Sequence, residues 1–402
     1  MNSYFQCSHV GFQNIAVNGN DGWVCNMFCS ALFHVDLTTL EMTLETILPA
    51  ENECGFKQYG PISYYKEKLI IAPLNGKDIL IYDLKKKTID CLQLDTGKIV
   101  AEEYVFLKIV LYNEVAFFVP LVGHCIVKLD LNTNEMEYLD DWFGEVERES
   151  GLEERNAIFS DVYDNGDGNI WLTSWQGNLV MEFNMNTNQY KLHSISGLEA
   201  LSSVVVTENN MMLTERDFST LSLYSFDGIC SKMQIDYPGF VSRWGIGKLH
   251  LYGEYVFLFP LFANMILKYN RITGEVQCAK ELNVQGKENS NVISLKRYVM
   301  KCCERINEEE VIYYSIPDSK IVKFNMKTCV AEELYTSIKE EEQEYLKSRL
   351  LEKSFLEGNY EKESLRLDSF IECIQGKYRG CSDDIGEDSS SYGKKIYQYL
   401  ND

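Results

Sequence analysis

Apolar and polar positions alternate over short stretches along most of this chain, and one kind of stretch recurs at nearly regular intervals. It is a strand-like run of aliphatic and aromatic residues that ends in Asp, Asn or Ser. Counted from the last residue of one stretch to the last of the next, the steps are 47, 47, 54, 41, 45 and 55 residues. Such a period, built from short strands, indicates a repeat fold in which each repeat is one small sheet. The seven stretches are Phe33–Asp36, Ile81–Asp83, Val127–Asp130, Met181–Asn184, Leu223–Ser225, Leu267–Asn270 and Val322–Asn325.

The segments around these stretches supply three more strands per repeat. In the second repeat the predicted strands are Ile62–Tyr65, Leu69–Pro73, Asp78–Leu84 and Thr88–Leu94. The third repeat has the same order, with strands at Leu107–Leu111, Val115–Val119, Cys125–Leu131 and Met136–Leu139. Four short strands per repeat predict an all-β protein, a β-propeller with one four-stranded blade per repeat. We count seven blades; six is the alternative, because residues 291–303 fit the strand pattern poorly.

Two insertions lengthen the repeat. Residues 140–156 separate the third and fourth blades and carry Trp142-Phe143 among several acids. Residues 304–310 are predicted to form an acidic loop inside the last blade. Both lie where the step between repeats exceeds 50 residues, so they are expected to extend loops rather than to interrupt blades.

The composition changes after about residue 336, so we divide the chain into a propeller, residues 1–336, and a helical tail, residues 337–402. In the tail, Tyr345, Leu346, Leu350 and Phe355 recur at helical spacing. Residues 365–374 suggest a second helix, and residues 376–391 form a Gly-, Asp- and Ser-rich linker. The favoured interpretation is a helical appendage packed on the propeller. The alternative is a docking arm for a partner.

Charge and cysteine content limit the setting and the partners. The chain holds 60 acidic and 38 basic residues, a net charge of −22, so neither nucleic acid nor an anionic membrane is an expected partner. The N-terminus shows no basic start with an apolar run, and no stretch is apolar enough to span a bilayer. We therefore expect a cytoplasmic protein. The odd number of cysteines, 13, and strand positions such as Cys91, Cys125, Cys278 and Cys329 predict reduced, mostly buried thiols.

Two resemblances accompany the repeat. The third strands with their Asp/Asn turns look like kelch-type blades, although the double glycine of kelch repeats is missing from every second strand. Residues 165–173, Asn-Gly-Asp-Gly-Asn-Ile-Trp-Leu-Thr, resemble the Asp-Gly-Asn-x-Trp-Phe-Thr blade of streptogramin lyases and of propellers in bacterial hybrid sensors. The likeness implies a bacterial propeller with Trp171 in its core. The lyase chemistry implied by that family needs a histidine base and a magnesium site, and no motif of this chain lines up with them.

The candidate binding face is the one on which the loops between second and third strands open, together with the loops that enter the first strands. Two tryptophans and several differing polar side chains on this face suit one asymmetric ligand, a saccharide or a peptide, or a protein partner. The plainer interpretation is that these loops are polar because they meet water. The candidate residues are Asn75, Lys77, His124, Trp175, Gln176, Arg216, Asp217, Arg243, Trp244 and Asn264.

No motif for catalysis, and none for a cofactor, stands out. Asp161, Asp164 and Asp167 have the spacing of a calcium loop, but a tight hairpin explains them equally well, so we expect no metal. The favoured hypothesis is a scaffold that binds a ligand or a protein without turnover. The alternative is a lyase, isomerase or hydrolase acting on a glycan or peptide at the channel mouth, with His124, Glu215, Arg216 and Asp217 as its acid, base and oxyanion groups.

Overall fold

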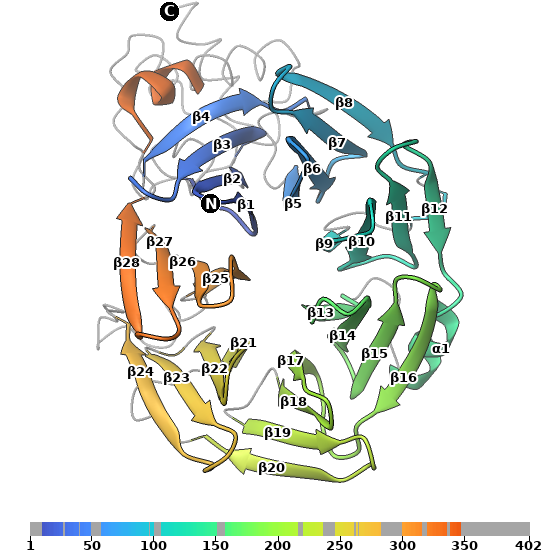
Figure 1. Ribbon diagram of the computed structural model, residues 1–402. Helices are drawn as coiled ribbons and strands as arrows, with labels where there is room; N and C mark the ends of the chain where they lie inside the picture. Colours follow the sequence, from blue (N-terminus) through green and yellow to red (C-terminus); the bar gives the residue numbers. More distant parts are fainter. Residues whose placement is uncertain are drawn as a thin grey trace, which may run out of the picture.

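The computed structural model shows seven four-stranded antiparallel sheets arranged as a ring around a central channel (Figure 1). In each blade the first strand lines the channel and the fourth lies on the rim. This arrangement confirms the seven-bladed propeller. The residues that the structure describes are 10–26, 29–39, 41–49, 58–95, 97–99, 106–150, 157–215, 220–235, 246–260, 263, 265–282, 300–315, 320–335 and 338–346.

Every blade is built from four strands that are consecutive in sequence and hydrogen-bonded in that order. The first four blades are β1–β4 (Ile15–Asn18, Asp21–Cys25, Ala31–Asp36, Met42–Ile47), β5–β8 (Tyr59–Tyr65, Lys68–Pro73, Asp78–Asp83, Thr88–Gln93), β9–β12 (Phe106–Tyr112, Val115–Pro120, Ile126–Asp130, Met136–Leu139) and β13–β16 (Phe159–Asp164, Asn169–Ser174, Leu179–Asn184, Gln189–Ser194). The last three are β17–β20 (Leu201–Val206, Asn210–Glu215, Thr220–Ser225, Cys230–Gln234), β21–β24 (Ile246–Tyr252, Tyr255–Pro260, Met265–Asn270, Val276–Glu281) and β25–β28 (Met300–Arg305, Glu310–Ser315, Lys320–Asn325, Val330–Tyr335).

The Asp or Asn that ends the third strand in six blades has a structural role. Its side-chain oxygen accepts the backbone N–H groups of the residues two and three positions later, as Asp36 does from Thr38 (2.7 Å) and Thr39 (3.0 Å). This bond pattern closes the turn into the rim strand and satisfies two of its backbone N–H groups. It therefore explains why the repeat is visible in the sequence. The same pair of bonds is made by Asp83, Asp130, Asn184, Asn270 and Asn325.

Hydrophobic packing between neighbouring blades holds the ring. Each pair of adjacent blades shares its own cluster of buried side chains, so the core is a closed series of seven clusters rather than one centre. Trp171, predicted to be core, is 6% exposed and packs between the fourth and fifth blades. The blades are thus wedges whose faces are both buried, as their nearly continuous apolar second strands require.

The ring closes between the seventh and first blades without exchange of a strand among the described residues. Phe12 packs on Tyr314, with ring centroids 5.0 Å apart, in a cluster that both blades share. The chain then leaves β28 and forms a short helical segment at residues 340–346 beside the rim of the first blade (Figure 1). Ile338 and Leu346 are buried in the same cluster.

This helical segment also protects an open sheet edge. The Glu342 carboxylate accepts the backbone N–H of Leu44 in the rim strand β4, at 3.0 Å. Unpaired edge amides invite pairing with other chains, so this contact satisfies a group that would otherwise be exposed. The start of the predicted tail therefore packs on the propeller. Residues 347–402, with the second predicted helix and the linker, lie outside the described residues. The docking role of the tail therefore stays a prediction.

Three local expectations need correction. Residues 304–310 are not wholly a loop, because Glu304 and Arg305 end β25, whose N-terminal half lies in the segment that fitted the pattern poorly. Residues 140–156 contain a helix, α1 (Phe143–Ser150), which the sequence analysis did not anticipate. The thiols are free where described, but Cys91 and Cys278 lie on rim strands and are exposed rather than buried.

Among the described helices, none has the length and apolar character needed to cross a membrane.

The packing of the helical segment predicts a measurable contribution to stability. Leu346→Ala should lower the free energy of unfolding by about 2–5 kcal/mol, because the side chain is fully buried between the first and last blades. The matched control is Tyr345→Ala: Tyr345 is 50% exposed, and its loss should change stability by about 0.5 kcal/mol or less. Denaturant unfolding of the full chain measures both. Equal effects of the two substitutions would show that this segment does not help to close the ring.

Candidate functional site: the central channel and its loop face

The innermost strands carry polar side chains at one level of the channel. In four blades the polar residue lies opposite the next-to-last residue of the second strand, directly after a break in the pairing register. A bulge of this kind turns a side chain out of the regular alternation. Because the break recurs, the ring presents its polar groups together at one height. The four residues are Lys108, Asp161, Ser203 and Lys248.

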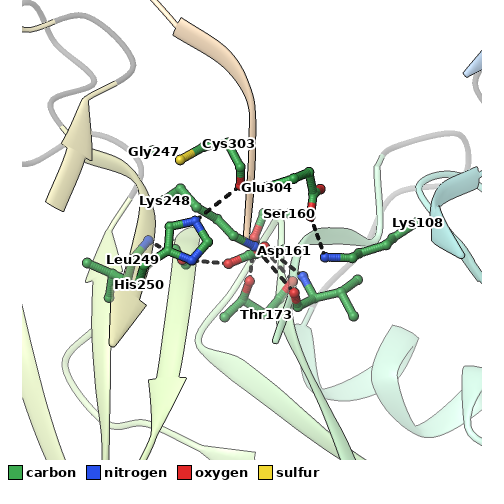
Figure 2. A network of polar contacts seen from close by, with 12 residues as sticks. Lys108, Ser160, Asp161, Thr173, Gly247, Lys248, Leu249, His250, Cys303 and Glu304 are labelled. Atoms are coloured by element: carbon green, nitrogen blue, oxygen red, sulfur yellow. Dashed lines mark hydrogen bonds and ion pairs between the residues drawn. The ribbon is translucent and has the colours of Figure 1, made fainter. Parts of the chain in front are cut away.

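One ion pair joins blades that are far apart in the ring. Lys108 of β9 contacts Glu304 of β25, with Nζ and the carboxylate oxygen 2.9 Å apart (Figure 2). The side chain of Asn14, just before β1, donates to the other Glu304 oxygen at 3.0 Å and accepts the Ile62 backbone N–H at 3.2 Å. The first, third and seventh blades therefore meet at the Glu304 carboxylate, and the second joins them through Asn14.

The other three blades meet at Asp161. Lys248 of β21 forms an ion pair with this carboxylate and donates to the Val162 carbonyl at 3.3 Å. Ser203 of β17 donates to the second oxygen of Asp161 at 2.5 Å and accepts the backbone N–H of Leu249 at 3.0 Å. A salt bridge, a serine and a strand amide thus link the fourth, fifth and sixth blades.

His250 connects the two halves of this network. Its Nε2 donates to the carbonyl of Cys303 at 3.2 Å, from the sixth blade to the seventh (Figure 2). Burial, together with the nearby Lys248 ammonium, lowers the pKa of His250 to about 3. Burial also raises the pKa of the Cys303 thiol well above its ordinary value. Near neutral pH both groups are therefore uncharged, and neither is prepared to act as base or nucleophile.

The Lys108–Glu304 pair is ionised. Burial alone would raise the pKa of Glu304, but the charges of Lys108 and Lys248 outweigh it and lower that pKa. Burial would lower the pKa of Lys108, but the Glu304 charge outweighs it, and the pKa of Lys108 is raised. Two cations thus face two anions in the channel, and each is paired. The arrangement neutralises its own charge and holds the blades in register.

Serine hydroxyls complete the connections between neighbouring inner strands. Ser63 donates to the carbonyl of Ile109 at 3.2 Å, Ser160 to that of Leu201 at 2.7 Å, and Ser202 to that of Ile246 at 3.0 Å. Each bond runs from one blade to the next along the chain. The carbonyls of Leu201 and Ile246 lie at breaks in the pairing register, so Ser160 and Ser202 satisfy groups that the ladder leaves free. The three serines thus have a structural task.

The described channel residues do not fit the magnesium site that the lyase resemblance implies. Among the residues that the structure describes, no group of three or more His, Cys, Asp or Glu side chains is placed to hold a metal ion. The three aspartates with calcium-loop spacing also have different partners, so they do not form one site. Asp161 is paired with Lys248, whereas Asp164 and Asp167 accept the backbone N–H groups of Gly166 and Asn169 in a tight turn, both at 2.8 Å.

The candidate ring of the sequence analysis falls on the loops between second and third strands, as far as these loops are described. Asn75 and Lys77 are exposed, and His124, Trp175 and Gln176 are half-buried. The structure adds a wall to this face: the ring of His124 stacks on Phe143 of α1, with centroids 4.1 Å apart. The other candidates lie outside the described residues, namely Arg216, Asp217, Arg243, Trp244 and Asn264.

Helix α1 is firmly attached to the blades. Trp142, just before it, is 1% exposed, packs on Phe159 at 5.3 Å and donates its indole N–H to the Leu139 carbonyl at 2.8 Å. Glu145 of α1 accepts the hydroxyl of Tyr190, on β16, at 2.9 Å. Residues 140–150 are therefore a fixed part of the loop face above the third and fourth blades.

Glu215, a proposed catalytic acid, has structural partners instead. It is 3% exposed, and its two carboxylate oxygens are both used. One accepts the Glu199 backbone N–H at 3.0 Å, and the other accepts from Thr220 at 3.2 Å and Lys232 at 3.1 Å. This carboxylate joins the segment before β17 to β19 and β20, so the enzyme hypothesis loses that residue as a free acid.

Comparisons with known proteins agree with the architecture. No protein-family model and no curated protein matches this sequence. By structure, the chain resembles catalytically inactive virginiamycin B lyase from Staphylococcus aureus with quinupristin (12% identity, TM-score 0.57, 80% of this chain and 97% of that one). It also resembles a streptogramin B lyase (12%, 0.52, 83% and 96%) and YCF48 bound to D1 peptide (10%, 0.54, 76% and 89%). The chain is a β-propeller. At these identities the likeness shows the fold alone.

The sequence analysis missed the channel network. Its members are single charged residues inside otherwise apolar inner strands, such as Lys108 in Phe-Leu-Lys-Ile-Val and Lys248 in Gly-Lys-Leu-His-Leu. That anomaly was a usable signal, because a lysine within an apolar strand is costly unless paired. The partner was not predictable, since Glu304 lies 196 residues from Lys108.

The ion pair across the channel predicts a non-additive mutational pattern. Lys108→Met and Glu304→Leu should each destabilise the protein by about 3–5 kcal/mol, because each leaves a buried charge without its partner. The double variant should recover most of that loss. Denaturant unfolding of the four proteins measures the coupling. Additive losses would show that the two groups do not interact.

His250 predicts an acid-side loss of stability. The unfolded imidazole takes up a proton near pH 6.5, whereas the buried one does so at about pH 3, so the unfolded state binds more protons between these values. Stability should therefore fall as pH is lowered from 6.5, by up to about 1.4 kcal/mol per pH unit. Glu304 stabilises above about pH 4.3, and its contribution is lost only as pH falls further, through its lowered pKa.

Unfolding measured between pH 6.5 and 4.5 lies above the range in which Glu304 loses its contribution, whereas His193, whose pKa burial also lowers, adds a slope of the same sign. His250→Asn keeps a side-chain donor for the Cys303 carbonyl and should make this part of the profile less steep. An unaltered slope in His250→Asn would contradict the assignment.

Proposed function

We propose that this propeller is a binding scaffold that holds a peptide, a saccharide or a protein partner on its loop face without turning it over. The observation that carries the proposal is the channel network: its two cations and two anions are paired with each other across the ring. Chemistry at the channel would need a group free to exchange a proton or attack, and the described groups instead connect blades.

The loop face supplies the recognition surface in this proposal. Trp175 and Gln176 follow β14, His124 follows β10, and α1 forms a fixed wall beside them. Half-buried aromatic side chains next to amides provide rigid apolar area together with hydrogen-bonding groups. Two structural neighbours, YCF48 bound to D1 peptide and virginiamycin B lyase with quinupristin, are propellers seen with a peptide or a ligand. We infer a partner of that general kind for this chain.

A cytosolic setting belongs to the same proposal. Eight described cysteines are free, including the exposed Cys91 and Cys278. Thiols of this kind suit a reducing compartment. The net charge of −22 disfavours nucleic acid and anionic membranes as partners.

A quantitative capture experiment with the full chain tests the scaffold. Trp175→Ala should reduce retention of a peptide or protein selected by the wild type by about tenfold, a loss typical of an aromatic anchor in an interface. Ile272→Ala is the matched control: Ile272 is 73% exposed on the turn between β23 and β24, which opens on the opposite face, and its loss should change nothing.

The enzyme alternative gives the opposite pattern. If the purified protein converted a defined glycan or peptide, and Lys248→Met or His250→Asn abolished that turnover while the fold persisted, the scaffold proposal would be wrong. Retention that depends equally on Trp175 and Ile272 would show that the loop face is not the binding surface.

A further inference from the structure

The chain contains the pair Asn-Gly at three places, each in a connection between two strands of one blade. They are Asn18-Gly19 at the β1–β2 turn, Asn75-Gly76 between β6 and β7, and Asn165-Gly166 between β13 and β14. Asn-Gly is the dipeptide most prone to spontaneous deamidation, because glycine has no side chain that shields its backbone nitrogen from the preceding asparagine. All three asparagines are exposed, so exposure alone does not distinguish them.

Deamidation begins when the backbone nitrogen of the glycine attacks the side-chain carbonyl carbon of the asparagine. A C–N bond forms, the side-chain nitrogen leaves as ammonia, and a succinimide ring remains. Water then opens the ring at either carbonyl, giving aspartate or isoaspartate, in which the main chain runs through the side-chain carbonyl. The reaction consumes only water, and its first step needs a glycine N–H that can lose its proton. A hydrogen bond from that N–H opposes the step, because the bond must break before the nitrogen can attack.

Two of the three glycine amides are engaged in such bonds. Gly76 donates to the backbone carbonyl of Gln58 at 3.1 Å. Gly166 donates to the carboxylate of Asp164 at 2.8 Å, and the negative charge of this acceptor further disfavours loss of the amide proton. Attack at either place therefore requires a local opening first.

The amide of Gly19 lacks a bond of this kind. It donates to no residue that the structure describes, and the Asn18 side chain makes no hydrogen bond with a described residue either. The φ angle of Gly19 is +61°, and no described atom beyond its chain neighbours lies within 4 Å of the place where a Cβ would stand. Both reacting groups are thus unengaged, and the turn is open on this side.

The Asn165-Gly166 pair is a matched comparison within the same chain. The φ angle of Gly166 is +81°, and its missing Cβ likewise has no described atom within 4 Å. The two places differ in the bonds that hold them, since Gly166 donates to Asp164 and the Asn165 side chain donates to Asp167 at 3.0 Å. A difference between their rates would therefore reflect these bonds rather than the dipeptide or its exposure.

We propose that Asn18 is a modification site, which converts to isoaspartate and aspartate in the folded protein while Asn75 and Asn165 persist. The β1–β2 turn opens on the face opposite the loops that carry His124 and Trp175, so this site is separate from the binding surface considered above.

Isoaspartate at this position acts on the closure of the ring. It adds one carbon atom to the main chain at the end of β1, so that Val17 no longer matches Gly22 across the hairpin. β1 lines the channel (Figure 1), and its Ile15 is buried in the cluster that joins the first and last blades. Modification of the turn therefore weakens the strand whose packing closes the propeller.

Peptide mass spectrometry of the full chain, after incubation at neutral and mildly alkaline pH, tests this site. Each Asn-Gly pair is followed by the mass gained when an amide becomes a carboxyl group, and fragmentation distinguishes isoaspartate from aspartate. In the folded protein Asn18 should convert at least about fivefold faster than Asn165, because attack at Asn165 must first break a hydrogen bond. In denaturant, where neither turn persists, the two rates should converge.

Substitutions at Asp164 test whether the hydrogen bond is the cause. Asp164 is exposed, so both variants are expected to fold. Asp164→Ala removes the acceptor of the Gly166 amide and should raise the rate at Asn165 about threefold or more. Asp164→Asn keeps an acceptor oxygen and should raise that rate less than Asp164→Ala does.

The effect on ring closure is tested with Asn18→Asp, which carries the new charge without the extra main-chain atom. This variant should unfold at the same denaturant concentration as the fresh wild type. The incubated wild type should show an additional transition at lower denaturant, with an amplitude that follows its isoaspartate content. The proposal is overturned if Asn18 and Asn165 convert equally fast in the folded protein, if Asp164→Ala leaves the Asn165 rate unchanged, or if isoaspartate at position 18 leaves unfolding unaltered.

Discussion

Closure of the ring is the constraint on which the rest of this structure depends. The first and last blades are each built from four consecutive strands, so no shared strand ties the ends of the described propeller together. Side-chain packing must do so. The cluster that contains Phe12, Tyr314, Ile338 and Leu346 joins the two blades from the channel side to the rim. The Asn14–Glu304 bond joins them at the channel itself.

The channel network extends this closure to all seven blades. A buried ion pair is weak evidence for added stability, because desolvation offsets most of the attraction between the charges. Its consequence here is geometric: Lys108 reaches Glu304 only if the third and seventh blades stand at the right distance, and Lys248 reaches Asp161 only if the sixth and fourth do. A ring with one blade fewer or a shifted register would leave four charges unpaired. The network therefore destabilises a ring with the wrong blade number or register more than it stabilises the native ring.

The fold was predictable from the sequence to the extent that its determinants are local. The Asp or Asn that ends the third strand in six blades bonds within its own turn, and Ser225 does the same in the fifth, so the seven blades could be counted from the pattern alone. The start of β25 was harder to recognise because its pairing is broken between Lys301 and Glu304. The site depends on contacts between blades, and these join residues such as Lys108 and Glu304 that no local pattern relates. All ten candidate loop-face residues stay predictions as ligand contacts, and five of them, Arg216 and Trp244 among them, lie outside the described residues.

Because all blades share one backbone unit, equivalent residues of different blades can be compared directly. Equivalent positions in different blades share their pairing and their surroundings, so a difference between them reflects the side chain rather than the fold. Trp23 and Trp171 are equivalent and equally buried, yet Tyr64 packs on the first and Phe226 on the second. Serines join some neighbouring inner strands, whereas charges join blades across the channel. The third and fourth blades depart from the repeat through α1, and the fourth also through its aspartate turn. The proposed binding surface accordingly lies beside α1, on blades that depart from the repeat.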